Sequence, residues 1–115
     1  MTAMADSADL AQRFRAAMLS GDAETLRSIV TDDVTFTGPL AKASGSDEVV
    51  NGLVEMGKMT TSDDVQVQLA DASNVLVWST LQTNVAPPTE AATWLSVNGD
   101  KISAVRTVFN AGGAT

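Results

Sequence analysis

The chain has 115 residues, of which 44% are hydrophobic, and a formal net charge of −7. This length suits one globular domain, and we expect residues 1–115 to form it, with short tails at 1–6 and 111–115. The negative charge argues against nucleic acid and anionic membranes as partners. Without cysteine or histidine the chain can form neither disulfides nor a zinc site with nitrogen or sulfur ligands, and we expect no metal or cofactor.

Targeting and membrane signals are not apparent in the sequence. Residues 1–9 lack the basic and apolar regions of a signal peptide, and nowhere do about 20 apolar residues follow one another. We therefore expect a cytoplasmic protein.

Two helices are predicted near the start of the chain. Leu10, Phe14 and Met18 recur at the spacing of one helical face. Asp6 or Ser7 can cap this helix, which we expect to end near residue 19. Asp22 can cap a second, shorter helix over Ala23 to Ile29. A pair of helices with one apolar side needs another layer to cover that side.

The segment 31–45 joins this helical part to a sheet. Val34 to Thr37 is β-branched or aromatic and predicts a short strand, which Gly38-Pro39 ends in a turn. Ser44 or Ser46 can then cap a third helix that ends within Met56 to Met59.

From residue 60 onward the periodicity becomes that of strands. After a loop at 60–62, strands are predicted at 65–69, 75–85, 91–97 and 101–110. Asn98-Gly99 is a favourable hairpin turn between the last two of them. Three helices followed by an antiparallel meander indicate an α+β fold.

Several fragments, in this order and spacing, match one superfamily. They are Ala16 to Asp22, Thr31 to Thr35, Gly38-Pro39, Ser44-Gly45, Val97 to Ile102 and Arg106 to Phe109. Together they resemble the nuclear-transport-factor-2-like superfamily in its ketosteroid-isomerase-like and SnoaL-like branch, over roughly residues 10–110. The resemblance implies three N-terminal helices packed on a strongly curved antiparallel sheet, a cone-shaped, cystatin-like roll. It also implies an apolar pocket between the helices and the concave face of the sheet.

The ketosteroid isomerases that this chain resembles use a tyrosine, a proton-shuttling carboxylate and a protonated aspartic acid. The corresponding positions here hold Phe14, Gly38 and Thr93. A positioned general base alone contributes about 10²–10⁴-fold to such reactions. We therefore expect no steroid isomerisation by that mechanism, and the catalytic residues stay unassigned.

The strand phase implied by the resemblance gives a pocket of mixed apolar and neutral polar character. The predicted lining is Phe14, Met18, Phe36, Gly38, Trp78, Thr80, Gln82, Asn84, Thr93, Leu95, Thr107 and Phe109. Such residues can orient a ligand carbonyl or hydroxyl. In an alternative interpretation their polar groups only bond one another or water in a wet core. No titratable side chain belongs to this set.

The acidic residues are interpreted mainly as structural. Asp32 and Asp33 lie where a helix passes into a strand, which favours a turn or capping role. Asp63 and Asp64 are interpreted as solvated loop charge, whereas Glu90 lies near the mouth of a hairpin and could reach a substrate.

A dimer is expected from the opposite face of the sheet. Trp94 alternates with Thr93 and Leu95 and would be exposed on a polar face of a monomer. Aromatic residues are enriched in interface cores, so Trp94 and Arg106 are predicted to lie at a homodimer interface.

The sequence thus predicts a domain that binds a small, mostly apolar, neutral molecule. One reading is an isomerase or cyclase of secondary metabolism, and the alternative is a non-catalytic carrier or sensor. Epoxide hydrolysis is less favoured because the predicted lining lacks an Asp-Arg-Asp set. A buried carboxylate in the pocket would favour the enzyme, and a lining of amides, hydroxyls and apolar groups alone would favour the binding protein.

Overall fold

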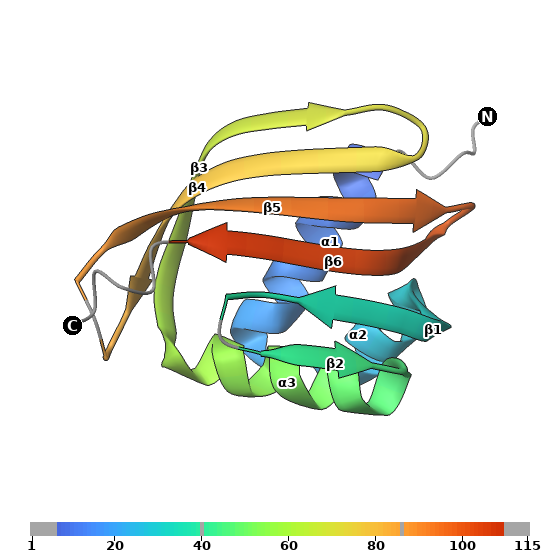
Figure 1. Ribbon diagram of the computed structural model, residues 1–115, viewed down its shortest axis with the longest axis horizontal. Helices are drawn as coiled ribbons and strands as arrows, with labels where there is room; N and C mark the ends of the chain where they lie inside the picture. Colours follow the sequence, from blue (N-terminus) through green and yellow to red (C-terminus); the bar gives the residue numbers. More distant parts are fainter. Residues whose placement is uncertain (1–6, 40, 86, 110–115) are drawn as a thin grey trace.

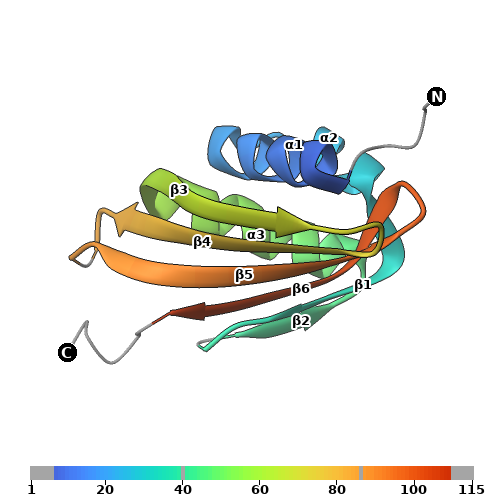
Figure 2. The ribbon, with the colours of Figure 1, turned by 90° about the horizontal axis from the view of Figure 1, so that it is seen from above.

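The computed structural model describes residues 7–39, 41–85 and 87–109. The predicted tails, the cap at residue 6 and the predicted strand end at residue 110 lie outside these ranges. Within them the chain forms three helices and a six-stranded sheet, an α+β fold as predicted. The helices gather on one face of the sheet, and the other face is left uncovered by any helix of the described part (Figure 1, Figure 2).

Two helices precede the sheet. Helix α1 spans Ser7–Ser20 and buries its apolar side, which includes Leu10 and Phe14. Helix α2, Ala23–Ile29, has the predicted cap: Asp22 Oδ1 accepts a hydrogen bond from the Thr25 backbone N–H at 3.1 Å, and Asp22 Oδ2 accepts one from the Thr25 hydroxyl at 2.7 Å. These two bonds favour the ionised carboxyl, the side-chain bond most, and so lower the pKa of Asp22.

Helix α3, Ser46–Met59, starts differently from the prediction. Its N-cap is Gly45, at φ 90°, and no side chain bonds the cap, so a serine cap from Ser44 or Ser46 was the wrong expectation. Glu48 instead accepts a hydrogen bond from the Ser44 N–H at 2.9 Å and so satisfies the backbone before the helix. The positive φ explains the choice, because glycine adopts it without the steric cost that serine would meet.

Helices α1 and α3 touch through their backbones. A Cβ built at Gly57 would overlap the carbonyl oxygen of Met18. Only glycine allows this approach, so Gly57 determines how closely α1 and α3 pack against each other.

The strands follow the order β2-β1-β6-β5-β4-β3 across the sheet. Their bounds are β1 Val30–Thr37, β2 Lys42–Ser44, β3 Thr60–Ala70, β4 Asn74–Thr83, β5 Thr89–Asn98 and β6 Lys101–Phe109. All neighbours are antiparallel except β1 and β6, which run parallel. The prediction of a purely antiparallel sheet was therefore wrong. No hairpin links β1 to β6, so turn chemistry in the sequence does not set their relative direction.

Three other boundaries differ from the sequence-based expectation. Strand β1 begins at Val30 rather than Val34, so the exposed Asp32 and Asp33 are strand residues, not turn residues. The predicted loop at 60–62 is the start of β3, and a short strand β2 occupies part of the predicted loop after β1. These segments were not predicted as strands because they contain polar residues of low strand propensity. Pairing with a neighbouring strand outweighs that propensity.

The hairpin turns carry the polar chemistry that turns require. Asp71 Oδ1 accepts hydrogen bonds from the N–H groups of Ser73 and Asn74 at 2.8 and 2.9 Å and closes the β3–β4 turn. The backbone bond from Ser73 and the side-chain bond from Asn74 lower the pKa of Asp71. The predicted β5–β6 hairpin is present, with Gly99 at φ 69°.

The core lies between the helices and the helix-facing side of the sheet. Helix residues such as Leu10, Leu26 and Val50 pack in one cluster with Val34 and Leu95 of the strands. In the described ranges no helix is both long and apolar enough to cross a membrane.

Candidate functional site

The candidate site lies on the helix-facing side of strands β3 to β6. Strand pairing aligns Gln68, Val77, Thr93 and Thr107 in one cross-strand row. The next row toward the β4–β5 hairpin holds Val65, Ser79, Ala91 and Phe109. Polar side chains therefore interrupt an otherwise apolar surface that the helices cover.

Thr93 and Thr107 form the polar centre of this surface. Their hydroxyl oxygens lie 3.3 Å apart and are hydrogen-bonded, and both residues are partly buried. Either hydroxyl can turn to meet a ligand oxygen, since each donates one hydrogen bond and accepts others. Leu95 and Phe109 lie on the same side of the sheet, the first fully buried and the second half-buried.

The predicted helix and β1 residues lie deeper in the structure. Phe14, Met18 and Phe36 are buried members of the core cluster. Gly38 lies in the turn after β1, where its N–H donates to the Ala41 carbonyl at 2.9 Å. Contact of any of these residues with a ligand stays a prediction.

The predicted phase of β4 was wrong. Val75, Val77 and Ser79 are buried on the helix-facing side, so Trp78, Thr80 and Gln82 point to the outer face, and Trp78 is 46% exposed. Asn84 is exposed beyond the end of the strand. Four consecutive apolar residues, 75–78, conceal the alternation from which a phase could be read.

On the outer face, Trp78 and Glu90 are joined. The Trp78 Nε1–H donates to Glu90 Oε1 at 2.8 Å. A pocket of about 450 Å³ opens beside this pair, lined by Thr80, Pro88, Thr89 and Glu90. It is an open surface pocket rather than part of the space between sheet and helices.

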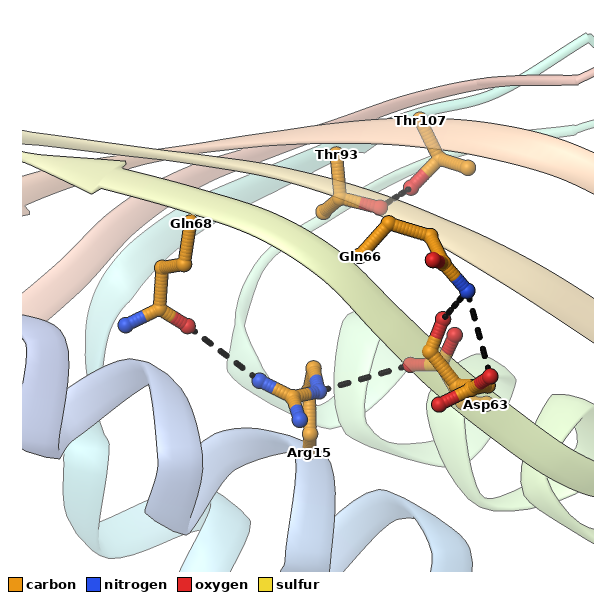
Figure 3. Close-up of polar contacts among 7 residues, drawn as sticks. Arg15, Asp63, Gln66, Gln68, Thr93 and Thr107 are labelled. Carbon is orange, nitrogen blue, oxygen red and sulfur yellow. Dashed lines mark hydrogen bonds and ion pairs between the residues drawn. The ribbon is translucent and has the colours of Figure 1, made fainter.

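A charged pair that sequence reasoning missed lies at the edge of the helix-facing surface. Arg15 of α1 reaches toward β3, where its Nε lies 3.4 Å from Asp63 Oδ2 and its Nη1 donates to Gln68 Oε1 at 3.4 Å. Figure 3 shows Arg15 between these two partners, with the Thr93 and Thr107 hydroxyls behind them. Only 8% of the Asp63 side chain and 21% of the Arg15 side chain are exposed.

The reading of Asp63 as solvated loop charge is therefore corrected. Asp63 belongs to β3 and pairs with Leu81, facing the helices, whereas Asp64 faces away and accepts a hydrogen bond from Gln66. Extending the Val65 alternation two residues upstream would have placed Asp63 on the inner side. Arg15 follows Ala11 by one helical turn, so helical spacing also indicated that Arg15 lies on the same side of the helix as Ala11.

The pair is incompletely satisfied. Three buried side-chain polar atoms among the described residues have no hydrogen-bond partner, and two of them are Arg15 Nε and Asp63 Oδ1; the third is Thr31 Oγ1. Charge-assisted N–H···O bonds are usually about 2.7–2.9 Å, shorter than either contact of Arg15. The arrangement can accept a hydrogen bond at Asp63 Oδ1.

The outer face of the sheet carries a second aromatic group. The guanidinium carbon of Arg106 lies 4.0 Å from the centroid of the Trp94 ring, and Arg106 Nη1 donates to Ser96 Oγ at 3.0 Å. The Trp94 Nε1–H donates to Asn74 Oδ1 at 2.9 Å. Trp94 thus faces outward as predicted, 40% exposed.

The family follows from a direct comparison. The profile of the SnoaL-like domain matches residues 11–105, and the chain belongs to this family. Its fold is that of the nuclear-transport-factor-2-like superfamily. Comparison with curated proteins gives no match.

Solved structures with this fold have low sequence identity to the chain. A nuclear-transport-factor-2-like protein of unknown function from Cytophaga hutchinsonii has a TM-score of 0.80 at 17% identity, covering 96% of this chain and 95% of its own. A Kribbella flavida protein provisionally assigned as a ketosteroid isomerase has 0.75 at 18%, with 87% and 74% covered. An epoxide hydrolase of the LEH-like type from M. tuberculosis has 0.75 at 17%, with 91% and 83% covered. At such identities the likeness establishes the fold, not the reaction.

Proposed function

We propose that this protein binds a small, mostly apolar, neutral molecule between the helix-facing side of the sheet and the helices. The observation that carries the proposal is the Thr93–Thr107 pair, which puts hydroxyls in an apolar, helix-covered surface. Ligand sites in proteins commonly combine apolar walls with a few polar groups of this kind. The family supports the proposal, since its fold is compatible with small-molecule binding.

Within this proposal an isomerase or cyclase is favoured over a carrier or sensor. Asp63 supports it, because a nearly buried carboxylate borders the same side of the sheet as the two threonines. Phe14, Gly38 and Thr93 still leave the ketosteroid isomerase groups absent, so the reaction would use a different acid or base. A carrier or sensor remains the alternative, and a cytoplasmic location stays a prediction.

Binding can be located by NMR with ¹⁵N-labelled protein. We would titrate steroids, polycyclic aromatics and polyketide-like ketones and follow the backbone amides together with the two indole N–H signals. We expect saturable shifts at Thr93 and Thr107, with the indoles of Trp78 and Trp94 unmoved because both lie on the outer face. Shifts concentrated at Trp78, Thr80 and Glu90 would place the ligand in the outer pocket and reject the proposal.

Turnover separates the enzyme from the carrier. Each ligand that binds is incubated with the protein. The mixture is analysed by NMR for a new product and by mass spectrometry for its unchanged mass, as isomerisation requires. A product whose rate falls at least about 10²-fold in Asp63→Asn would support a proton-transfer role. Binding without any product would favour the carrier.

We also propose a homodimer formed through the outer face. Leu76, Trp78, Trp94 and Val108 are exposed there, and the sheet has no helix over this side in the described part (Figure 2). Exposed aromatic and aliphatic groups on one face are typical of an interface. The paired side chains Trp94 and Arg106 would lie within it.

Molar mass in solution tests the dimer. We expect twice the chain mass from light scattering at micromolar concentration, and a monomer for Leu76→Lys, which places a charge on this face. Leu19→Lys is the matched control, because Leu19 is an exposed leucine of α1. A monomeric wild-type protein would contradict the proposal.

A further inference from the structure

The Arg15–Asp63 pair is a polar group that the fold itself does not explain. Two polar atoms of these side chains, Arg15 Nε and Asp63 Oδ1, are buried without a hydrogen-bond partner. Leaving a buried polar atom unpaired destabilises the folded state, and more so when the group is charged. Buried ion pairs seldom add net stability, and apolar residues of similar volume often replace them without loss. A role in stability is therefore a poor explanation for this pair.

The geometry leaves one carboxylate oxygen of the pair, Asp63 Oδ1, buried without a hydrogen-bond donor. Arg15 approaches Asp63 through Oδ2 only, at 3.4 Å, and leaves Oδ1 without a donor. Arg15 also places a positive charge beside this carboxyl group. What is missing at Oδ1 is a hydrogen-bond donor.

The position of the pair links it to the proposed binding surface. Asp63 and Gln68 flank Val65, whose row continues through the small residues Ser79 and Ala91. Arg15 is more exposed than Asp63, so a ligand would approach along the arginine. The long contacts of Arg15, both 3.4 Å, leave room for the side chains to move apart or close on a ligand.

We propose that Asp63, paired with Arg15, binds the hydroxyl group of the ligand by accepting its hydrogen bond at Oδ1. This inference rests on the proposed function and specifies its ligand class: a neutral apolar molecule, such as a phenol or hydroxysteroid, with a hydroxyl at one end. The Thr93–Thr107 pair then serves a second polar group farther along the surface. The O–H donor satisfies the carboxylate atom that the protein's own groups leave unpaired.

The test compares ligands that differ only in this donor. We would measure the dissociation constants of 2-naphthol against 2-methoxynaphthalene, and of oestrone against its 3-methyl ether. A hydrogen bond to a charged group predicts about tenfold or more tighter binding of the free hydroxyl in at least one pair. A methyl ether keeps the apolar body and loses the donor.

The variant to test is the double substitution Arg15→Met with Asp63→Leu. It removes both charges together, so neither is left buried alone, and it puts apolar side chains in their place. We expect this variant to fold and to bind the hydroxyl and ether forms with a ratio near one. The matched control is Arg27→Met with Asp47→Leu, which removes an exposed pair of the same two residue types at 3.3 Å. The control should keep the wild-type ratio.

Each outcome decides between specific statements. Equal binding of hydroxyl and ether by the wild-type protein, or a preference that survives Arg15→Met/Asp63→Leu, would overturn the role of Asp63 and leave the proposed binding function standing. Failure of every probe to bind the wild-type protein would overturn the binding function and this inference with it. If the double variant does not fold, the dissociation constants of the hydroxyl and ether ligands are measured by NMR for Asp63→Leu alone. A ratio of these constants equal to that of the wild-type protein overturns the inference as well.

Discussion

The two faces of the sheet use their polar groups in opposite ways. On the outer face the indoles of Trp78 and Trp94 are exposed but fully paired, with Glu90 and Asn74 as acceptors. On the helix-facing side Arg15 and Asp63 are nearly buried and incompletely paired. A face whose polar groups already have partners suits packing against another surface, whereas a buried acceptor without a donor suits a ligand that brings one.

The largest effect on stability is expected at the contact between helices α1 and α3. In Gly57→Ala the new Cβ would overlap the Met18 carbonyl, so α1 and α3 must separate and uncover the inner face. We expect a loss of about 3 kcal/mol in the free energy of unfolding, measured by urea denaturation.

Gly52→Ala is the control in the same helix. Nothing lies within 4 Å of a Cβ at Gly52, so alanine should stabilise α3 by about 1 kcal/mol through helix propensity. Similar effects of the two substitutions would mean that the helices do not touch at Gly57.

A smaller effect on stability should distinguish the two faces of the sheet within one strand. Val105 is 1% exposed and faces the helices, whereas Val108 is 65% exposed on the outer face of the same strand. Val105→Ala removes buried methyl groups and should cost about 2 kcal/mol of unfolding free energy. Val108→Ala should change it by less than about 0.5 kcal/mol. Equal losses, measured on diluted protein, would show that the two faces are not distinct.

The contact between the helical layer and the edge hairpin should be weaker still. The buried Ser7 hydroxyl donates to the Asp71 carbonyl at 2.6 Å and joins the start of α1 to the β3–β4 turn. Ser7→Ala should cost about 1 kcal/mol in chemical denaturation. The exposed Ser28, whose hydroxyl bonds its own helix, gives the control Ser28→Ala.

The smallest effect concerns pH. The hydrogen bonds of Asp71 lower its pKa below the ordinary value of 3.8, so its ionised form stabilises the folded state at neutral pH. That contribution is lost as the pH falls below the ordinary value and through the folded pKa. The melting temperatures of wild type and Asp71→Ala should therefore converge as the pH is lowered from 7 to 3. A constant difference across this range would contradict the assignment.

Much of the fold could be predicted because strong local signals specify it. Asp22 marked the start of α2 and Asn98-Gly99 marked the β5–β6 hairpin, each through chemistry carried by one or two residues. The parallel pairing of β1 with β6 carries no such signal, since it joins segments far apart in the chain. The strand that became β6 was predicted, but its parallel pairing with β1 was not.

The candidate site was harder to predict, for two physical reasons. The apolar run at 75–78 fits either face, so Trp78 was placed in the pocket although it points outward. Asp63 was interpreted as solvated loop charge because it lies just before the predicted strand at 65–69, and its partner Arg15 lies on another element. Only the packing of α1 on β3 brings the two together.

The parallel pairing of β1 with β6 also affects how the chain can fold. Val30 pairs with Ile102 and Phe36 with Val105, so the whole of β2, α3 and the strands β3 to β5 separates β1 from its long neighbour in the sequence. Loop closure over so many residues carries an entropic cost before any contact repays it. Folding should therefore be slow for a domain of this size, and the helices with β1 and β2 should not persist as an independent folding unit when β6 is removed.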